Sequence, residues 1–241
     1  MYTMQRFLVV MIGAALASIA GAQSMPYQPP PDAQQPYQAP PPDGPAAYGD
    51  NAPAQSDPPG RVARLSFLNG EVSFTPAGEE NWVQAQVNRP VVTGDKLWTD
   101  ADAHAELSLG AATVRLDRSS SFDFLNLDDQ LAQMELTQGT LNLNVRRVRG
   151  NETYEVDTPT IAFVANRDGD YRINVDPNGG TTVTAWRGSG DAVGEGGRRV
   201  TIEEGQSVVF NDSQLSNPLV TQVNARHEGV PRNDFDTFVS E

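Results

Sequence analysis

The chain of 241 residues contains no cysteine, and it carries 31 acidic against 17 basic side chains, for a formal net charge of −14. Without cysteine it can form no disulfide framework, thiolate metal site, iron–sulfur cluster or cysteine nucleophile. Because nucleic acids and anionic membrane surfaces repel an acidic chain, we expect neither of them as a partner.

The first 22 residues predict the compartment. An apolar run of thirteen residues, FLVVMIGAALASI at 7–19, follows Arg6 and precedes the small-residue sequence AGA at 20–22. This pattern is typical of a secretory signal peptide cut after Ala22, and the run is shorter than the roughly twenty apolar residues that span a bilayer. We therefore expect a periplasmic or secreted protein of a Gram-negative-type envelope that begins at Gln23 and is not inserted in a membrane. The alternative is that residues 1–22 stay in place as an anchor.

Residues 23–60 are rich in proline. They hold twelve of the eighteen prolines, no Lys or Arg, and the near-repeat PYQPPPD (26–32) and PYQAPPPD (36–43). Proline fixes φ and donates no backbone hydrogen bond, so this segment is predicted to be a disordered, extended linker. The alternative is a ligand for a proline-recognising partner, since the Pro-Tyr repeats present rings at regular intervals.

Residues 61–210 alternate between apolar and polar residues. The clearest segments are LSF (65–67), VSF (72–74), AELSL (105–109), VRL (114–116), LNLNV (141–145), YRINV (171–175), VTA (183–185), VTI (200–202) and SVVF (207–210). Asn69 and Gly70 predict a hairpin between the first two segments. Roughly fifteen short strands without an amphipathic helix predict an all-β domain, an antiparallel sandwich or roll.

Residues 211–241 form a tail in which the strand pattern weakens. Asn233 is predicted to cap a short helix with Phe235, Phe238 and Val239 on one face. Since this pattern stops after two turns, we expect the gene product to continue beyond it.

The sequence DADAH at 100–104 suggests a metal site. Asp100, Asp102 and His104 occupy alternate positions, and alternate residues of a strand lie about 6.5 Å apart on one face. However, the two aspartates belong to a turn, where Asp is favoured for its local hydrogen bonds. His104 is in phase with the polar residues Glu106 and Ser108. We therefore predict a solvated turn and no metal ligands.

Two other segments imitate known sites. Residues 166–170, NRDGD, resemble part of a calcium-binding loop, but Gly169 is at the fourth position and Pro177 at the twelfth, so a hairpin turn is predicted. Residues 188–194, GSGDAVG, miss the spacing of a nucleotide-binding loop and predict a β-turn. The sequence offers no nucleophilic triad and no suitable pair of carboxylates, so we predict no catalytic residue, no cofactor and no enzymatic activity.

Trp98 is the candidate partner contact. In KLWT (96–99), Leu97 is predicted to point inward, which places Trp98 on the opposite face with Lys96. An aromatic ring there suits a protein partner or a sugar ring. The alternative is that a second layer or the C-terminal tail covers it, while Trp82 and Trp186 are predicted to be core or strand-end aromatics.

An ordered set of short motifs gives a family resemblance. The set is GEV (70–72), Trp82, GDKLWT (94–99), AEL (105–107), VRL (114–116), LTQGTL (136–141), YEVDTPT (154–160), VTAWRG (183–188) and GQ (205–206). Over residues 61–210 the chain therefore resembles FecR-type domains, which implies a periplasmic all-β domain that binds or signals and is not an enzyme. Relatives in iron-transport signalling carry a sigma-factor-binding segment and a membrane helix before this domain. A signal peptide and a Pro-rich linker resemble the secreted FecR-like proteins instead.

The leading hypothesis is a non-enzymatic, FecR-like binding or interaction module of the cell envelope, with a protein or glycan partner. One alternative is a carbohydrate- or peptidoglycan-binding protein that uses Trp98. The other is a transmembrane signalling component related to the sigma regulators, which requires residues 1–22 to remain as an anchor.

Overall fold

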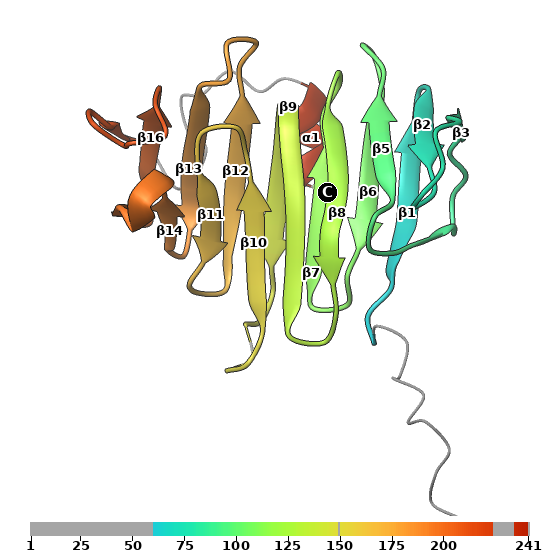
Figure 1. The fold of residues 1–241 in the computed structure, drawn as a ribbon, viewed down its shortest axis with the longest axis horizontal. Coiled ribbons are helices and arrows are strands. Elements are labelled where there is room, and N and C mark those ends of the chain that lie inside the picture. Colours follow the sequence, from blue (N-terminus) through green and yellow to red (C-terminus); the bar gives the residue numbers. More distant parts are fainter. Residues whose placement is uncertain (1–59, 149, 224–233, 241) are drawn as a thin grey trace, which may run out of the picture. The chain divides into compact units, whose positions relative to one another are not determined.

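Two β-sheets, packed face to face, make up most of the structure, a computed structural model that describes residues 60–148, 150–223 and 234–240 (Figure 1). All of these residues belong to one compact unit. The predicted signal peptide and nearly all of the Pro-rich linker lie outside the described residues. Within the described ranges, the structure has no helix with the length and apolarity that crossing a membrane requires.

Each sheet has its own set of strands, and one strand belongs to both. Sheet A contains, in spatial order, β4 (Pro90–Val91), β1 (Ala63–Asn69), β6 (His104–Ser108), β7 (Ala112–Leu116), the second half of β9 (Leu131–Val145), β12 (Gly169–Val175), β13 (Thr181–Arg187), β16 (Gln206–Phe210) and β17 (Leu219–Gln222). Sheet B contains β3 (Val83–Gln84), β2 (Val72–Thr75), β5 (Lys96–Thr99), β8 (Ser121–Leu127), the first half of β9, β10 (Thr153–Asp157), β11 (Ala162–Ala165), β14 (Gly190–Val193) and β15 (Arg199–Ile202). A 3₁₀ turn at Glu195–Gly197 and the helix α1 (Asp234–Ser240) complete the described elements.

The long strand β9 crosses from one sheet to the other at Gly139. Residues 131–138 pair with β8 and β10 in sheet B, whereas residues 139–145 pair with β7 and β12 in sheet A. Gly139 has φ = 91°, a left-handed conformation that glycine adopts without strain. The two layers therefore share one continuous backbone (Figure 1).

The predicted fold class is confirmed, with one exception to its antiparallel pairing: β9 and β10 run parallel. Alternate residues of the strands point into a single apolar core between the sheets, as a period of two requires. The largest fully buried rings of this core are Tyr154, Tyr171, Phe74, Phe122, Phe124, Phe163 and Phe210.

The predicted hairpin at Asn69 and Gly70 is wrong. These residues join β1 of sheet A to β2 of sheet B, so the two strands lie in different layers. Residues 166–168 likewise connect β11 of sheet B to β12 of sheet A, not the two arms of a hairpin. Of the turn predicted at 188–194, only residues 188, 189 and 194 lie outside strands, because residues 190–193 form β14. Turn-forming residues are found both in connections between the two sheets and in hairpins within one sheet, and the sequence does not distinguish the two.

Candidate functional site

The helix α1 lies on the outer face of sheet A. Phe235 is 1% exposed, and the ring of Phe238 lies 5.2 Å from the ring of Phe67 on β1. The two phenylalanines are three positions apart and so project from one side of the helix. We define the α1 groove as the sheet A residues that receive this side, namely Phe67, His104, Arg115, Arg172 and Trp186.

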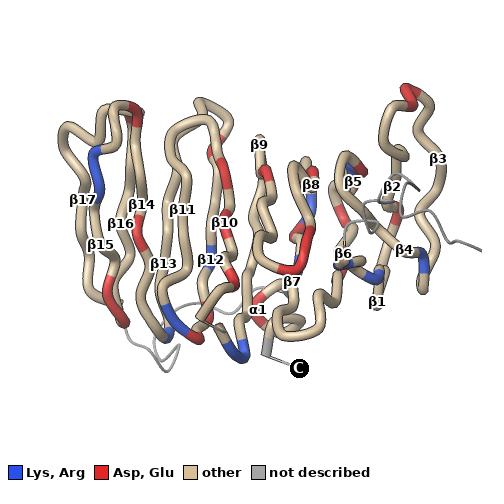
Figure 2. Tube along the Cα trace, turned by 60° about the horizontal axis from the view of Figure 1, so that its bottom comes forward, with Lys and Arg blue, Asp and Glu red and all other residues tan. Residues whose placement is uncertain are grey.

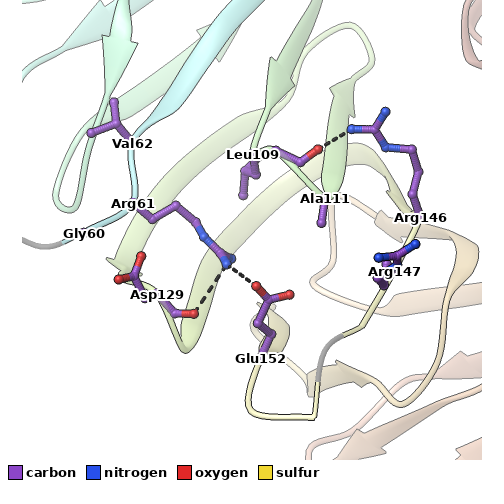
Figure 3. Close-up of a pocket in the computed structure, with 10 residues that line it drawn as sticks. Gly60, Arg61, Val62, Leu109, Ala111, Asp129, Arg146, Arg147 and Glu152 are labelled. Atoms are coloured by element: carbon purple, nitrogen blue, oxygen red, sulfur yellow. Dashed lines mark hydrogen bonds and ion pairs between the residues drawn. The ribbon is translucent and has the colours of Figure 1, made fainter.

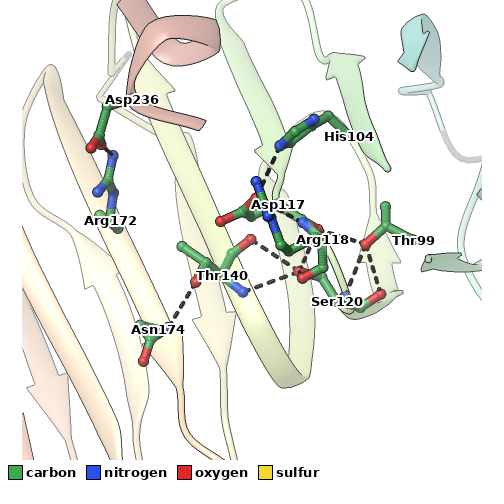
Figure 4. A network of polar contacts seen from close by, with 9 residues as sticks. All are labelled: Thr99, His104, Asp117, Arg118, Ser120, Thr140, Arg172, Asn174 and Asp236. Atoms are coloured by element: carbon green, nitrogen blue, oxygen red, sulfur yellow. Dashed lines mark hydrogen bonds and ion pairs between the residues drawn. The ribbon is translucent and has the colours of Figure 1, made fainter. Parts of the chain in front are cut away.

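Arg172 on β12 is the centre of the α1 groove. Its guanidinium forms an ion pair with Asp236 of α1 (Figure 4). It also lies 5.3 Å from the ring of Phe235 and 5.9 Å from the ring of Trp186. The side chains of Arg172 and Asp236 are only 17% and 6% exposed. A cation held between aromatic rings and paired with a carboxylate in a largely desolvated place is a strong anchor for α1.

Arg115 on β7 holds the other end of the helix. Its Nη1 donates a hydrogen bond to the backbone carbonyl of Val239 at 3.2 Å, and its guanidinium lies 5.5 Å from the ring of Phe238. Glu106 on β6 fixes this arginine by accepting a hydrogen bond from Nε at 2.8 Å. Cationic side chains are favourable near a helix C-terminus because the last carbonyls have no partner within the helix.

His104 is buried, which corrects the prediction that it belongs to a solvated turn. Residues 101 and 102 do form a turn, but His104 is 8% exposed and lies beneath α1, 6.0 Å from the ring of Phe235 and 5.6 Å from that of Phe238. Its Nε2 lies 3.0 Å from Oδ1 of Asp117. The polar face of β6 is thus covered by a helix far away in the sequence. In the described part of the chain, no three His, Asp or Glu side chains come together as a metal site would require.

A hydrogen-bond network beneath the groove connects the two sheets (Figure 4). Thr99 of β5 donates from Oγ1 to the carbonyl of Asp117 at 2.6 Å and accepts from the backbone N–H of Ser120 at 2.9 Å. Ser120 Oγ accepts from the N–H of Thr140 at 3.1 Å, and Asn174 donates to Oγ1 of Thr140 at 2.7 Å. Buried polar groups that are satisfied in this way fix their backbone rigidly, so the network positions the strands that carry His104 and Arg172.

The helix does not fill the space beside it. A hollow of about 430 Å³ remains next to α1, lined by Phe67, Asn69, Asp102, His104, Arg118, Thr237 and Phe238. Its walls come from both the α1 groove and α1 itself. A ligand larger than α1 therefore has room in the same place.

A second hollow, of about 580 Å³, lies at the end of the sheets where β1 begins (Figure 3). Its central side chain is Arg61, which donates to Oε1 of Glu152 at 2.8 Å and to the carbonyl of Asp129 at 3.4 Å. Arg146, at the rim, donates to the carbonyl of Gly110. Glu152 neutralises Arg61, and Arg146, Arg147 and Asp129 also line the hollow.

The outer face of sheet B carries a row of carboxylates. Asp123, Glu135 and Asp157 are direct neighbours on β8, β9 and β10, and acidic positions are visible along β10 in Figure 2. Glu155 lies beside this row, and Gln133 donates to it at 2.9 Å and to Asp157 at 2.8 Å. Burial, followed by the charge of Asp157, raises the pKa of Glu155, and burial with the charge of Asp123 does the same for Glu135.

Replacing Glu155 by glutamine is expected to stabilise the fold at pH 7 by about 0.5 kcal/mol, because it removes repulsion between neighbouring like charges. Since the pKa of Glu155 is higher in the folded state than its ordinary 4.5, the folded protein binds more protons than the unfolded chain just above pH 4.5, and stability falls as pH rises through that range. The free energy of unfolding of the Glu155→Gln variant should fall less over the same pH range. Urea unfolding between pH 4.5 and 7 measures this, with Glu80→Gln in an exposed loop as the control. A less stable variant at pH 7 would contradict the assignment.

Trp98 lies on the outer face of β5 in sheet B, whereas the α1 groove is on sheet A. It is half-buried, and its indole N–H donates to Oδ1 of Asp100 at 2.7 Å. A partner contact at Trp98 stays a prediction. Trp82 is exposed just before β3, and Trp186 is buried beside Arg172.

Several residues of the FecR-like motifs hold turns in place. Asp95, only 4% exposed, accepts hydrogen bonds from the N–H groups of Ala77 and Val92, both at 2.9 Å. Thr158 Oγ1 accepts a hydrogen bond from the N–H of Ile161 at 3.0 Å and so stabilises the turn between β10 and β11. These residues explain the backbone path and do not indicate a ligand.

Comparisons with known proteins gave limited similarity. No family model matches the sequence, and no curated protein matches it. Two crystal structures of a proposed anti-sigma factor from Parabacteroides distasonis ATCC 8503 are similar, with 11% and 12% identity and a TM-score of 0.47 each. Each match covers 54% of this chain and 61% of that one, so less than two thirds of that protein is matched. A similarity of this extent does not identify a function.

Proposed function

We propose that the chain is a non-enzymatic, FecR-like binding module of the bacterial cell envelope that recognises a protein partner through the outer face of sheet A. One observation carries this proposal: a separate helical segment, α1, is bound on that face by two arginines and a set of aromatic rings. The face therefore has the chemistry that binds a protein segment.

The composition of the α1 groove supports recognition over permanent packing. Arginine and aromatic residues dominate the binding energy of protein interfaces. Arg172 and Phe67 are therefore better explained as binding residues than as core residues.

The remaining parts of the proposal rest on the sequence. The ordered FecR-like motifs support the family and the absence of catalysis, and residues 7–22 support export to the periplasm or beyond. The described structure is an all-β sandwich, which agrees with the fold that the resemblance implies.

Site-specific photo-crosslinking tests the proposal. Phe67 is at the rim of the α1 groove and is 41% exposed, and Leu125 on sheet B is 42% exposed, so the two positions form a matched pair. A photoreactive residue at Phe67 in the full chain, expressed in its own host, is expected to give a discrete adduct with another envelope protein. The same residue at Leu125 is expected to give none.

Adducts of equal yield at both positions, or none at Phe67, would overturn the assignment of sheet A as the binding face. Intact mass and N-terminal sequencing of the same preparation test the export. We expect the chain to begin at Gln23, and a full-length chain held in the membrane fraction would contradict this.

A further inference from the structure

We infer that the α1 groove binds a short helical segment of a partner protein, that this segment carries two aromatic residues three positions apart with a carboxylate directly after the first, and that it displaces α1. This inference rests on the proposed function and names its ligand. The sequence FDTF at 235–238, seated in the groove, supplies the pattern.

The two rings set the spacing of the ligand. Phe235 enters the buried part of the groove against His104, with ring centroids 6.0 Å apart and planes 11° from parallel. Phe238, one turn later, packs at the rim against Phe67 and His104. Residues three apart lie on one side of a helix, so a helix with this spacing places both rings as α1 does, whereas an extended peptide does not.

The contact between Asp236 and Arg172 indicates that the ligand carries a negative charge after its first aromatic residue. Asp236 directly follows the first aromatic residue, and it neutralises Arg172 where the arginine is largely shielded from water. A ligand without an acid at this place would leave a buried guanidinium without its counter-ion, which is costly. Arg115 adds a second requirement, because it needs a carbonyl at the end of the ligand helix.

The properties of α1 favour its displacement. A helix of seven residues is too short to be stable in water without its contacts, so α1 forms only while it occupies the groove. It is bound as part of the same chain, through residues 224–233, and such tethering typically corresponds to an effective concentration in the millimolar range. The hollow of about 430 Å³ beside Thr237 and Phe238 shows that α1 leaves groove surface uncovered. A longer partner helix gains these contacts and competes with α1.

Fluorescence polarisation with a labelled peptide tests the inference. The probe is residues 231–241, PRNDFDTFVSE, and the proteins are the full chain and its Phe235→Ala/Phe238→Ala variant, in which the groove is open. Because the tethered α1 competes in the full chain, the probe is expected to bind the open variant at least about tenfold more tightly. A probe in which both phenylalanines are alanine should not bind.

A charge reversal makes the test specific to the groove. Arg172→Glu in the open variant is expected to lower the affinity for the probe at least about tenfold, and a probe with Asp236→Lys should recover part of the loss. Circular dichroism and urea unfolding establish that each variant is folded. If the probe binds a folded open variant no better than the wild type, or if Arg172→Glu has no effect, the inference is wrong.

A second copy of the chain is the competing occupant. If sedimentation shows that the wild type is a dimer that the Phe235→Ala/Phe238→Ala change converts to a monomer, α1 docks between copies and the inference of a foreign ligand is overturned. Failure here is distinguishable from failure of the proposed function. If the peptide binds but Phe67 gives no crosslinks, the α1 groove is a helix-binding site, but the proposed envelope partner is refuted. If Phe67 gives crosslinks but the peptide does not bind, the envelope partner is supported, but the inference of a helical ligand is refuted.

Discussion

Gly139→Ala is expected to lower the free energy of unfolding by about 4 kcal/mol. A residue other than glycine at φ = 91° costs about 1 to 2 kcal/mol in backbone strain. In addition, a Cβ at this position would lie 2.6 Å from Cα of Ser120 and 2.8 Å from the carbonyl oxygen of Ser119, and overpacking of this kind typically costs about 1 to 3 kcal/mol. Urea unfolding followed by tryptophan fluorescence measures the loss.

Gly110→Ala is the matched control. Gly110 has a similar φ of 78°, but a Cβ there meets no atom within 4 Å. Gly110→Ala should therefore lower the free energy of unfolding only by the backbone strain, about 1 to 2 kcal/mol. Equal losses at Gly139 and Gly110 would show that the close approach of β9 to Ser120 does not constrain the crossing between the sheets.

Tyr171→Ala is expected to cost about 4 kcal/mol, because a fully buried ring is replaced by a cavity. The ring packs 5.2 Å from the ring of Phe163 in the other sheet. Its hydroxyl lies 2.7 Å from the carbonyl oxygen of Arg167 and 3.0 Å from that of Ser189, so it ties together two connections that cross between the layers. Burial raises the pKa of Tyr171 to about 12, so the hydroxyl keeps its proton at neutral pH.

Tyr171→Phe separates the ring from the hydroxyl. It keeps the packing and leaves two carbonyl groups without this donor, for an expected cost of about 1 to 2 kcal/mol. Chemical unfolding of both variants gives the two values. If phenylalanine costs as much as alanine, the hydroxyl and not the ring carries the stability of this region.

The alternation of residues in the sequence was sufficient to predict the fold class and the core-facing side of strands such as β5, β6 and β9. Leu97, Leu107 and Leu143 are buried, as their phase predicts. The pairing of the strands could not be predicted in the same way. Asn69 and Gly70 have the residue types of a hairpin turn, yet they connect different sheets, because a period of two defines the face of a strand and not its partner.

The α1 groove could not be predicted from the sequence for a related reason. Phe67, His104, Arg115, Arg172 and Trp186 come from five strands, and no local spacing connects them. Only α1 has a local signal, the pair Phe235 and Phe238 on one side of a short helix. A partial signal was available at Trp186, a large aromatic residue in phase with Thr182 and Thr184, which indicates an outer face that something covers. Phe67 gave no such signal, because it is in phase with Leu65 in the sequence and reaches the outer face through the bulge between these two residues.

Because β9 belongs to both sheets, the order in which the chain emerges from the ribosome matters for its folding. The first eight strands reach neither a complete sheet A nor a complete sheet B until residues 131–145 have been made, since β7, β8, β10 and β12 all pair with this one strand. The earlier strands can pair with one another as β1–β6–β7 and as β2–β5–β8, but these two groups are not joined through a shared strand until β9 has been made. The strands that follow β9 can join either sheet only after this strand is in place, so the two halves of the sandwich are expected to assemble around residues 131–145.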